Sequence, residues 1–390
     1  MRLQQLLNNL EIQKMNTTII PITEDNLQLV REGGGKWGMP RSVGWLRRCF
    51  FDPTVEGWTK DKVRGHMSID EHGEVRAMHC YYYQPCYLRQ KKIIGSTGAI
   101  MGSDSKYGEE LVRVFEGNNK TREKDAVGFG NCIANKRAAK VNRVVFGLRD
   151  PPYRSKEIRI GAADLSAYPL GVLGRLHLYS QFVGFLVFML LRPLAWIVRG
   201  FACIFGKCGG YRIVEQASFG DARFDAFWNR FLAANDGVVS SRDPRRLRWL
   251  FDESIKAGKV LLATAERDGR IDGYVLLRAE EGCDKAPKLY DIIDVCAVAN
   301  DTNCLRDLGK GALRLAGRHG GVKVFFVGGM PKQEEWLDKV FPYCHQKDFS
   351  SFMYVASDPE VRESLEQNKG WFFGPFDGEF CMGHGGDIDL

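Results

Sequence analysis

The chain has 390 residues, of which 44% are hydrophobic and 26% are charged, and this balance excludes a disordered protein. Its length exceeds the roughly 250 to 300 residues at which a single hydrophobic core stops growing, so we expect two domains. The net charge of +7 suits an anionic partner such as a phosphorylated cofactor, an acidic membrane surface or nucleic acid. A solvated basic surface would carry the same charge.

Cysteine and histidine usage narrows the class further. The eleven cysteines include no C-x-x-C pair and lie mostly in apolar segments, which indicates reduced thiols and a cytoplasmic protein. The seven histidines have no spacing typical of metal ligands, so we expect no metal ion.

The N-terminal half opens with a strand at 17–22 and a helix that begins after Thr23, a natural N-cap. A hairpin follows over 63–83, with its turn at Gly73, because glycine supplies the positive φ that a tight loop needs. The next expected elements are a strand at 93–101, a helix at 105–115, a strand at 126–130 and a helix at 135–146. An order of this kind predicts a mixed, mostly antiparallel sheet flanked by helices.

The C-terminal half repeats the same order. Its turn glycine, Gly269, comes 196 residues after Gly73. The expected elements are a strand at 211–216, a helix at 222–233, a hairpin over 259–277, a strand at 288–298, a helix at 301–319, a strand at 322–328 and a helix at 332–341. We therefore predict two tandem α/β domains, at 1–160 and 211–390, with a hydrophobic linker at 161–210.

The linker contains an almost wholly apolar segment at 182–205. Arg192, Arg199 and Lys207 recur at about seven-residue spacing, which is typical of a helix that lies on a membrane surface. A helix packed between the two domains and a membrane-spanning helix are the alternatives, and the sequence leaves all three open. A membrane-surface helix would place the protein on the inner face of the membrane.

Three strings carry a family resemblance. ITEDNLQLVRE at 22–32 resembles the opening of a GNAT domain, ERDGRIDGYVLLR at 266–278 resembles the central hairpin, and NKRAAKVNRVVFGL at 135–148 resembles the late helix. The chain thus resembles the GNAT superfamily of N-acyltransferases, present twice. It is also similar to two-domain acyltransferase-like proteins of bacterial surface-polysaccharide gene clusters and to the Fem aminoacyl transferases.

The resemblance implies an acyl-CoA co-substrate, acetyl-CoA or another acyl-CoA, with its pyrophosphate at a helix N-terminus. In the first half the matching stretch is MGSDSKYGEEL at 101–111, although Glu110 stands where the family has a second glycine. The cofactor-binding residues implied there are Met101, Gly102, Lys106, Tyr107, Gly108 and Asn135. The second-half stretch at 298–308 lacks the glycines, and we interpret its Asp301 or Thr302 as a helix cap.

Acyl transfer needs a base for the attacking amine and an acid for the leaving thiolate. The family often uses a strand carboxylate and a helix tyrosine, but the first-half strand has no acid and Asn142 occupies the tyrosine position. In the second half, Asp294 lies in an apolar strand as either a site residue or a carboxylate paired with an Arg or Lys, and Tyr290 of the same strand is a further catalytic candidate. His79 is a further candidate, but alternating aromatic residues of that strand are typical of a core.

Two further stretches give alternatives. In the C-terminal segment, the aromatic strand around Glu379 either covers the cleft of the second domain, which would make Glu379 catalytic, or closes the core as an edge strand. The run RDPRRLRW at 242–249 either meets a phosphate or a nucleotide-sugar, or is a solvated helix face.

Three functions are therefore open. The first is acyl-CoA-dependent N-acylation of an amino sugar or a similar small-molecule or saccharide amine in surface-polysaccharide assembly. The second is Fem-like transfer from aminoacyl-tRNA to a peptidoglycan precursor, which is the one reading with a nucleic-acid partner. The third is a non-catalytic GNAT-like binding module. We favour the first.

Overall fold

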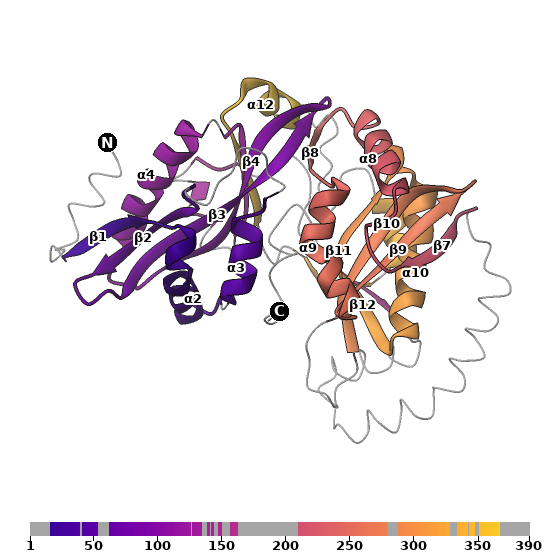
Figure 1. The fold of residues 1–390 in the computed structure, drawn as a ribbon, viewed down its shortest axis with the longest axis horizontal. Coiled ribbons are helices and arrows are strands. Elements are labelled where there is room, and N and C mark those ends of the chain that lie inside the picture. The colour runs from indigo at the N-terminus through magenta and orange to yellow at the C-terminus, as the bar shows by residue number, and fades with distance from the viewer. Residues whose placement is uncertain are drawn as a thin grey trace, which may run out of the picture.

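The computed structural model describes residues 16–39, 41–53, 62–125, 127–134, 139–140, 142–143, 147–149, 157–162, 210–279, 288–327, 334–341, 343–347 and 351–366. Within these ranges the chain forms two seven-stranded sheets, each flanked by helices (Figure 1). This is the tandem α/β architecture that the sequence predicts.

The first sheet holds the N-terminal hairpin at its centre. Its strands, in spatial order, are β1 (Thr17–Pro21), β2 (Gly65–Asp70), β3 (Val75–Leu88), β4 (Lys91–Ser103), β5 (Phe129–Ala134) and β14 (Ser351–Ala356). A seventh strand, β8 (Val238–Ser240), pairs with the end of β3. Neighbouring strands run antiparallel except β4 and β5, which are parallel.

Helices cover both faces of this sheet. They are α2 (Leu27–Lys36), preceded by the 3-10 turn η1 (Glu24–Asn26), α3 (Val43–Phe50) and α4 (Gly108–Lys124). The side chains of Met78 and His79 point to opposite faces because they are consecutive in β3. Gly33 of α2 lies against Met78, and the ring of Phe115 in α4 stacks on His79. Helices α2 and α4 therefore lie on opposite faces.

The second sheet repeats this plan. Its strands, in spatial order, are β13 (Tyr343–Lys347), β6 (Glu157–Ala162), β12 (Gly321–Val327), β11 (Lys288–Ala297), β10 (Arg270–Ala279), β9 (Val260–Arg267) and β7 (Arg212–Gln216). The remaining elements are α8 (Arg223–Ala233), α9 (Pro244–Lys256), η3 (Val298–Asn300), α10 (Thr302–Arg318), α11 (Glu334–Val340) and α12 (Pro359–Glu366). Both predicted turn glycines have positive φ, 79° at Gly73 and 74° at Gly269.

The sheets are not built from contiguous halves, which corrects the domain boundaries expected from the sequence. Strand β6, expected in the N-terminal domain, lies between β12 and β13 of the second sheet. Strand β14, expected in the C-terminal domain, pairs with β5 of the first, and α12 lies above that half (Figure 1). Each sheet thus contains a strand from the other half of the chain. This exchange of strands covers the edges of β5 and β12, which would otherwise present unpaired backbone groups.

Polar and apolar contacts also join the halves. One cluster of buried apolar residues contains members of both. Arg246 of α9 forms a buried ion pair with Asp52, 3.3 Å away, and Arg48 of α3 bonds Glu253. The two halves therefore pack as one body.

Several predictions fall outside the described residues. They are the apolar segment 182–205, most of the 135–146 helix with Asn135, and the C-terminal segment with Glu379. No helix in the described part of the chain is long and apolar enough to span a bilayer.

Candidate functional site

A parallel strand pair that separates partway along its length forms the centre of the site. β4 and β5 pair only from Gly95 opposite Phe129 to Thr97 opposite Asn131, although β4 runs on to Ser103 and β5 to Ala134. Beyond Thr97 the strands no longer share hydrogen bonds, so a wedge opens between them. In the second sheet, β11 and β12 pair from Lys288 opposite Gly321 to Ile292 opposite Phe326, and β11 continues to Ala297.

Each sheet carries a β-bulge beside this parallel strand pair. In β3 and β4, His79 pairs with Met101 and Tyr81 with Gly98, so β4 contributes one extra residue. In β10 and β11, Leu276 pairs with Asp294 and Leu277 with Ile292, so β11 likewise contributes one extra residue. A bulge leaves a strand residue outside the ladder and re-aims its neighbours, and bulges are frequent next to active sites.

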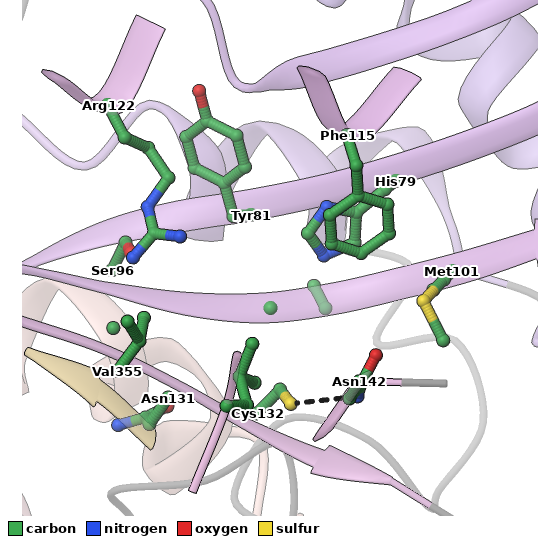
Figure 2. Close-up of a pocket in the computed structure, with 14 residues that line it drawn as sticks. His79, Tyr81, Ser96, Met101, Phe115, Arg122, Asn131, Cys132, Asn142 and Val355 are labelled. Carbon is green, nitrogen blue, oxygen red and sulfur yellow. Dashed lines mark hydrogen bonds between the residues drawn. The ribbon is translucent and has the colours of Figure 1, made fainter. Parts of the chain in front are cut away.

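The wedge contains a cavity of about 60 Å³ (Figure 2). Its wall combines His79 and Gly98 at the bulge, Phe115 and Arg122 from α4, and Asn142. The side-chain oxygen of Asn142 is buried and has no hydrogen-bond partner among the described residues. Buried polar atoms are normally paired, so this oxygen marks a place where a ligand could bind.

A hydrogen-bonded chain fixes the protonation of His79. The Nδ2 group of Asn118 donates to the His79 carbonyl oxygen at 3.1 Å and to His79 Nδ1 at 2.8 Å. Asn118 Oδ1 therefore accepts a hydrogen bond from His66 Nδ1, 2.7 Å away. Because His79 Nδ1 accepts, the proton of the neutral imidazole is on Nε2.

The Nε2–H group of His79 lies next to the bulge. A Cβ added to Gly98 would be 3.3 Å from His79 Nε2 and 3.1 Å from Cys132 Cβ, so the absence of a side chain at Gly98 leaves this space open. Removal from water, with Arg122 and His66 nearby, lowers the pKa of His79 to about 3. His79 is thus a neutral hydrogen-bond donor at physiological pH and not a general base.

The predicted cofactor-binding residues lie along the run from the wedge to α4. Met101 lines the cavity, Lys106 is in an exposed turn, Tyr107 is the N-cap of α4 and Gly108 is its first residue. Gly102 has a packing role, because a Cβ there would overlap the Trp37 ring. Asp104 fixes this turn by accepting hydrogen bonds from Lys36, Trp37 and Arg76.

The two equivalent helix N-termini differ. In α4 the N-cap residue Tyr107 makes no side-chain capping hydrogen bond, and no other described side chain accepts from the first backbone N–H groups. In α10 the Asp301 carboxylate accepts hydrogen bonds from the backbone N–H groups of Asn303 and Cys304, at 2.8 and 3.2 Å. The interpretation of Asp301 as a cap is thus confirmed, and the uncapped terminus is the one in the first half.

The predicted catalytic residues of the second half lie away from the wedge described above. Asp294 is completely buried, accepts a hydrogen bond from the Tyr274 hydroxyl and forms an ion pair with Arg242, 3.1 Å away. Tyr290 is buried, and its hydroxyl donates to the His319 carbonyl at 3.5 Å. The structure therefore places Asp294 in the paired state that the sequence left open as an alternative.

Sequence reasoning missed the cavity residue Arg122 and the residue Asn118, which bonds His79, and it gave His79 too little weight. Arg122 and Asn118 lie on α4 at four-residue spacing with the apolar Phe115 and Val114 nearby, so a polar pair on a buried helix stripe was the available signal. The sequence names His79 as a candidate, but in a strand whose alternating aromatic residues are typical of a core. Arg242 and Arg246 belong to the run that the sequence leaves open between a phosphate contact and a solvated helix face, and they are buried and paired with carboxylates.

Comparisons with solved structures find a similar fold in several acyltransferases. A GCN5-related N-acetyltransferase from Anabaena variabilis shares 8% identity over 87% of this chain and 73% of its own, with a TM-score of 0.52. An N-myristoyltransferase of Saccharomyces cerevisiae with bound myristoyl-CoA and inhibitors shares 13% identity over 93% and 88%, with a TM-score of 0.56. A probable N-acyltransferase from Enterococcus faecalis shares 9% identity over 89% and 74%, with a TM-score of 0.53.

At these identities the likeness establishes the fold alone: the chain has the GNAT fold in tandem. No protein-family model matches the sequence, and no curated protein matches it. The activity must therefore be argued from the site.

Proposed function

We propose that the protein is an acyl-CoA-dependent acyltransferase that transfers a short acyl group to an amine, with its active site in the wedge between β4 and β5. The observation that carries this proposal is the cavity at that wedge, beside a bulge and a fixed N–H donor. The structural neighbours with bound myristoyl-CoA support an acyl-CoA as the donor.

The residues present fit the phosphates of an acyl-CoA in the first half. The uncapped first turn of α4 offers backbone N–H groups, and Lys106 lies in the exposed turn before it. Glu109 and Glu110 in the first turn oppose an anion, but Glu110 is engaged by Ser68 and Arg113. In the second half, Asp301 already occupies the N-terminus of α10, so one phosphate site is expected, in the first half.

His79 supplies the electrostatic part of the chemistry. A thioester carbonyl held at Gly98 would face the Nε2–H group of His79, and this donor would stabilise the negative charge that develops on the oxygen. Donation needs no proton transfer from His79, in keeping with its low pKa. The Asn118 amide holds the ring in the tautomer that can donate.

The acceptor amine must lose its proton elsewhere, because none of the described residues of the cavity wall is a carboxylate. A more open hollow of about 560 Å³ adjoins the cavity and shares Phe115 and Arg122 with it. The described part of its wall includes two acidic residues, Glu123 and Asp358. We assign the amine to this side.

The size of the cavity favours a short acyl group. A cavity of about 150 Å³ is known to hold benzene, and the wedge offers about 60 Å³. Acetyl and similarly small groups match this volume, whereas a myristoyl chain exceeds it. The acceptor expected from the sequence, an amino sugar in surface-polysaccharide assembly, is part of the proposal, with the second half helping to shape its binding site.

The test is a thermal-shift series followed by turnover. The protein is mixed with CoA, acetyl-CoA, myristoyl-CoA or aminoacyl-tRNA, and thiol release is then followed with a panel of amino sugars and other amines. We expect stabilisation by CoA and acetyl-CoA and acetylation of at least one amine. Stabilisation by aminoacyl-tRNA alone would favour the Fem-like function, and stabilisation by none of them would reject catalysis in the wedge.

A further inference from the structure

The guanidinium of Arg122 lies in the wedge, in space that Gly130 leaves open because it has no side chain. Arg122, near the end of α4, extends into the cavity toward β4 and β5, and Figure 2 shows its guanidinium next to Ser96. A Cβ at Gly130 would overlap Arg122 Nη2 and lie 3.2 Å from the Ser96 hydroxyl oxygen. The guanidinium thus fills the space that any larger residue at 130 would occupy.

This guanidinium has no counter-ion. It makes no ion pair and no hydrogen bond within the described residues, and its Nε is buried without an acceptor. Removal from water lowers the pKa of Arg122, while Tyr81 and Tyr83 act in the opposite direction. Arg242 and Arg246 differ from Arg122, because they are more deeply buried and each faces a carboxylate.

A partly buried charge without a partner destabilises a fold, and such groups occur where a ligand supplies the partner. A smaller or apolar residue at position 122 would avoid this destabilisation. The sequence instead has Arg122, together with a glycine at 130 that leaves room for the guanidinium. The arrangement therefore indicates a site for an anion.

The position of Arg122 identifies which anion. The helix rises about 1.5 Å per residue, so Arg122 lies about 21 Å along α4 from Gly108. A diphosphate at the N-terminus of α4 is therefore out of its reach. Arg122 lies instead where the narrow cavity meets the open hollow, because it lines both.

A planar guanidinium in a narrow passage matches a carboxylate, which it can bind through two parallel hydrogen bonds. We propose that Arg122 is a carboxylate-binding residue of the active site, which selects a substrate that carries a carboxylate close to the reacting group. The carboxylate has two sources: the far end of a short dicarboxylic acyl group on the donor, or an acceptor with a carboxylate beside its amine. This assignment rests on the proposed function.

The test compares substrates that differ only in that charge. On the donor side the pair is succinyl-CoA and butyryl-CoA, and on the acceptor side it is amino acids and their methyl esters, with acetyl-CoA as donor. We expect a preference in kcat/KM of about 100-fold or more for the charged member of one pair. The pair that shows it identifies the source.

Two variants and one control assign that preference to Arg122. Arg122→Gln removes the charge, and Gly130→Ala keeps the charge but displaces the guanidinium, a flexible side-chain end that can move. Both should reduce the preference to below about fivefold and leave the CoA-induced thermal shift unchanged. Arg113→Gln on the same helix, where Arg113 pairs with Glu110, should keep the preference.

The outcomes separate this inference from the proposed function. If the protein binds CoA and acylates amines but neither pair shows a preference, or if Arg122→Gln retains it, the carboxylate assignment is wrong and the acyltransferase stands. If neither CoA nor acyl-CoA binds at all, the proposed function and the carboxylate assignment are both wrong.

Discussion

The Asp294 carboxylate lies 3.1 Å from the Arg242 guanidinium, and both side chains are completely buried. The pair joins the bulged strand β11 to the segment between β8 and α9. Loss of one partner leaves a buried charge unpaired, so we expect Asp294→Ala to lower the free energy of unfolding by about 3 to 5 kcal/mol. Urea denaturation measures the change.

An exposed ion pair at the start of α9 serves as the control for Asp294. Arg245 and Asp243 form an ion pair in which the arginine side chain is 75% exposed, so Arg245→Ala should cost less than about 1 kcal/mol. The folded fraction of Asp294→Ala should retain its acyltransferase kcat. A stable variant that has lost catalysis would instead return Asp294 to the catalytic role that the sequence allowed.

His79 should act in the transition state and not in acyl-CoA binding. His79→Phe removes the Nε2–H donor, so we expect kcat to fall by about 10²- to 10³-fold with little change in KM for the acyl-CoA. Asn118→Leu leaves the ring but releases its tautomer, and we expect a loss of about 10- to 100-fold. Steady-state kinetics on both variants decides, and an unchanged kcat in His79→Phe would remove His79 from the mechanism.

The protonation of His79 should be visible in acid. Its pKa in the folded protein is about 3, below the ordinary value of 6.5, so the unfolded chain binds a proton that the folded chain does not bind between these values. Stability from this group is complete above pH 6.5 and is lost as the pH falls toward 3, by up to about 1.4 kcal/mol per pH unit. His66, whose pKa is lowered by burial, adds to the same loss.

An NMR titration of the imidazole resonances tests this expectation. The His79 signals should keep the neutral, Nε2-protonated shifts from pH 8 down to the onset of acid unfolding. A His79 midpoint near the ordinary value of 6.5 would mean that the ring is solvated and free to act as a base.

The N-terminus of α4 should bind the phosphates of CoA. Gly108 is its first residue, and a Cβ there meets nothing within 4 Å, so Gly108→Glu should fold normally while placing a negative charge at the binding site. We expect the CoA-induced thermal shift to disappear. Thr302→Glu, at the matching position of α10, should leave the shift intact because Asp301 already caps that helix. The reverse pattern would move the phosphate site to the second half.

The sequence predicts the local part of this structure well. Each hairpin depends on a turn glycine and two alternating strands, so Gly73 and Gly269 were enough to place them. The exchange of β6 and β14 was not predictable in this way, because each is a strand of six residues whose partner lies far away in the chain. A short apolar strand does not specify which sheet edge it will cover.

For the site, too, the sequence predicts the local features and not the contacts between distant segments. Met101 and Gly108 could be placed because they follow a strand that leads into a helix. His79 could not, since strand alternation shows that it shares a face with Tyr81 but not that a cavity opens beside that face. Asp294 looked catalytic because its partner Arg242 lies 52 residues earlier, in a run of charges that resembles a solvent-exposed helix.

The exchange of strands predicts that neither half folds alone. A fragment of residues 1–209 lacks β14 and β8 and retains β6, which has no sheet to join. It would leave one edge of β5 unpaired, so we expect it to aggregate or to melt without a cooperative transition. The fragment 210–390 lacks β6, which separates β12 from β13, and should behave in the same way.

Co-expression of the two fragments should restore the protein, because together they supply every strand of both sheets. We expect a tag on either fragment to recover both in equal amounts, and the complex to bind CoA as the intact chain does. The intact chain should show one cooperative thermal transition, since a common core and the Arg246–Asp52 ion pair join the halves. Two separate transitions, or a fragment that folds cooperatively by itself, would show that the exchanged strands are dispensable for stability.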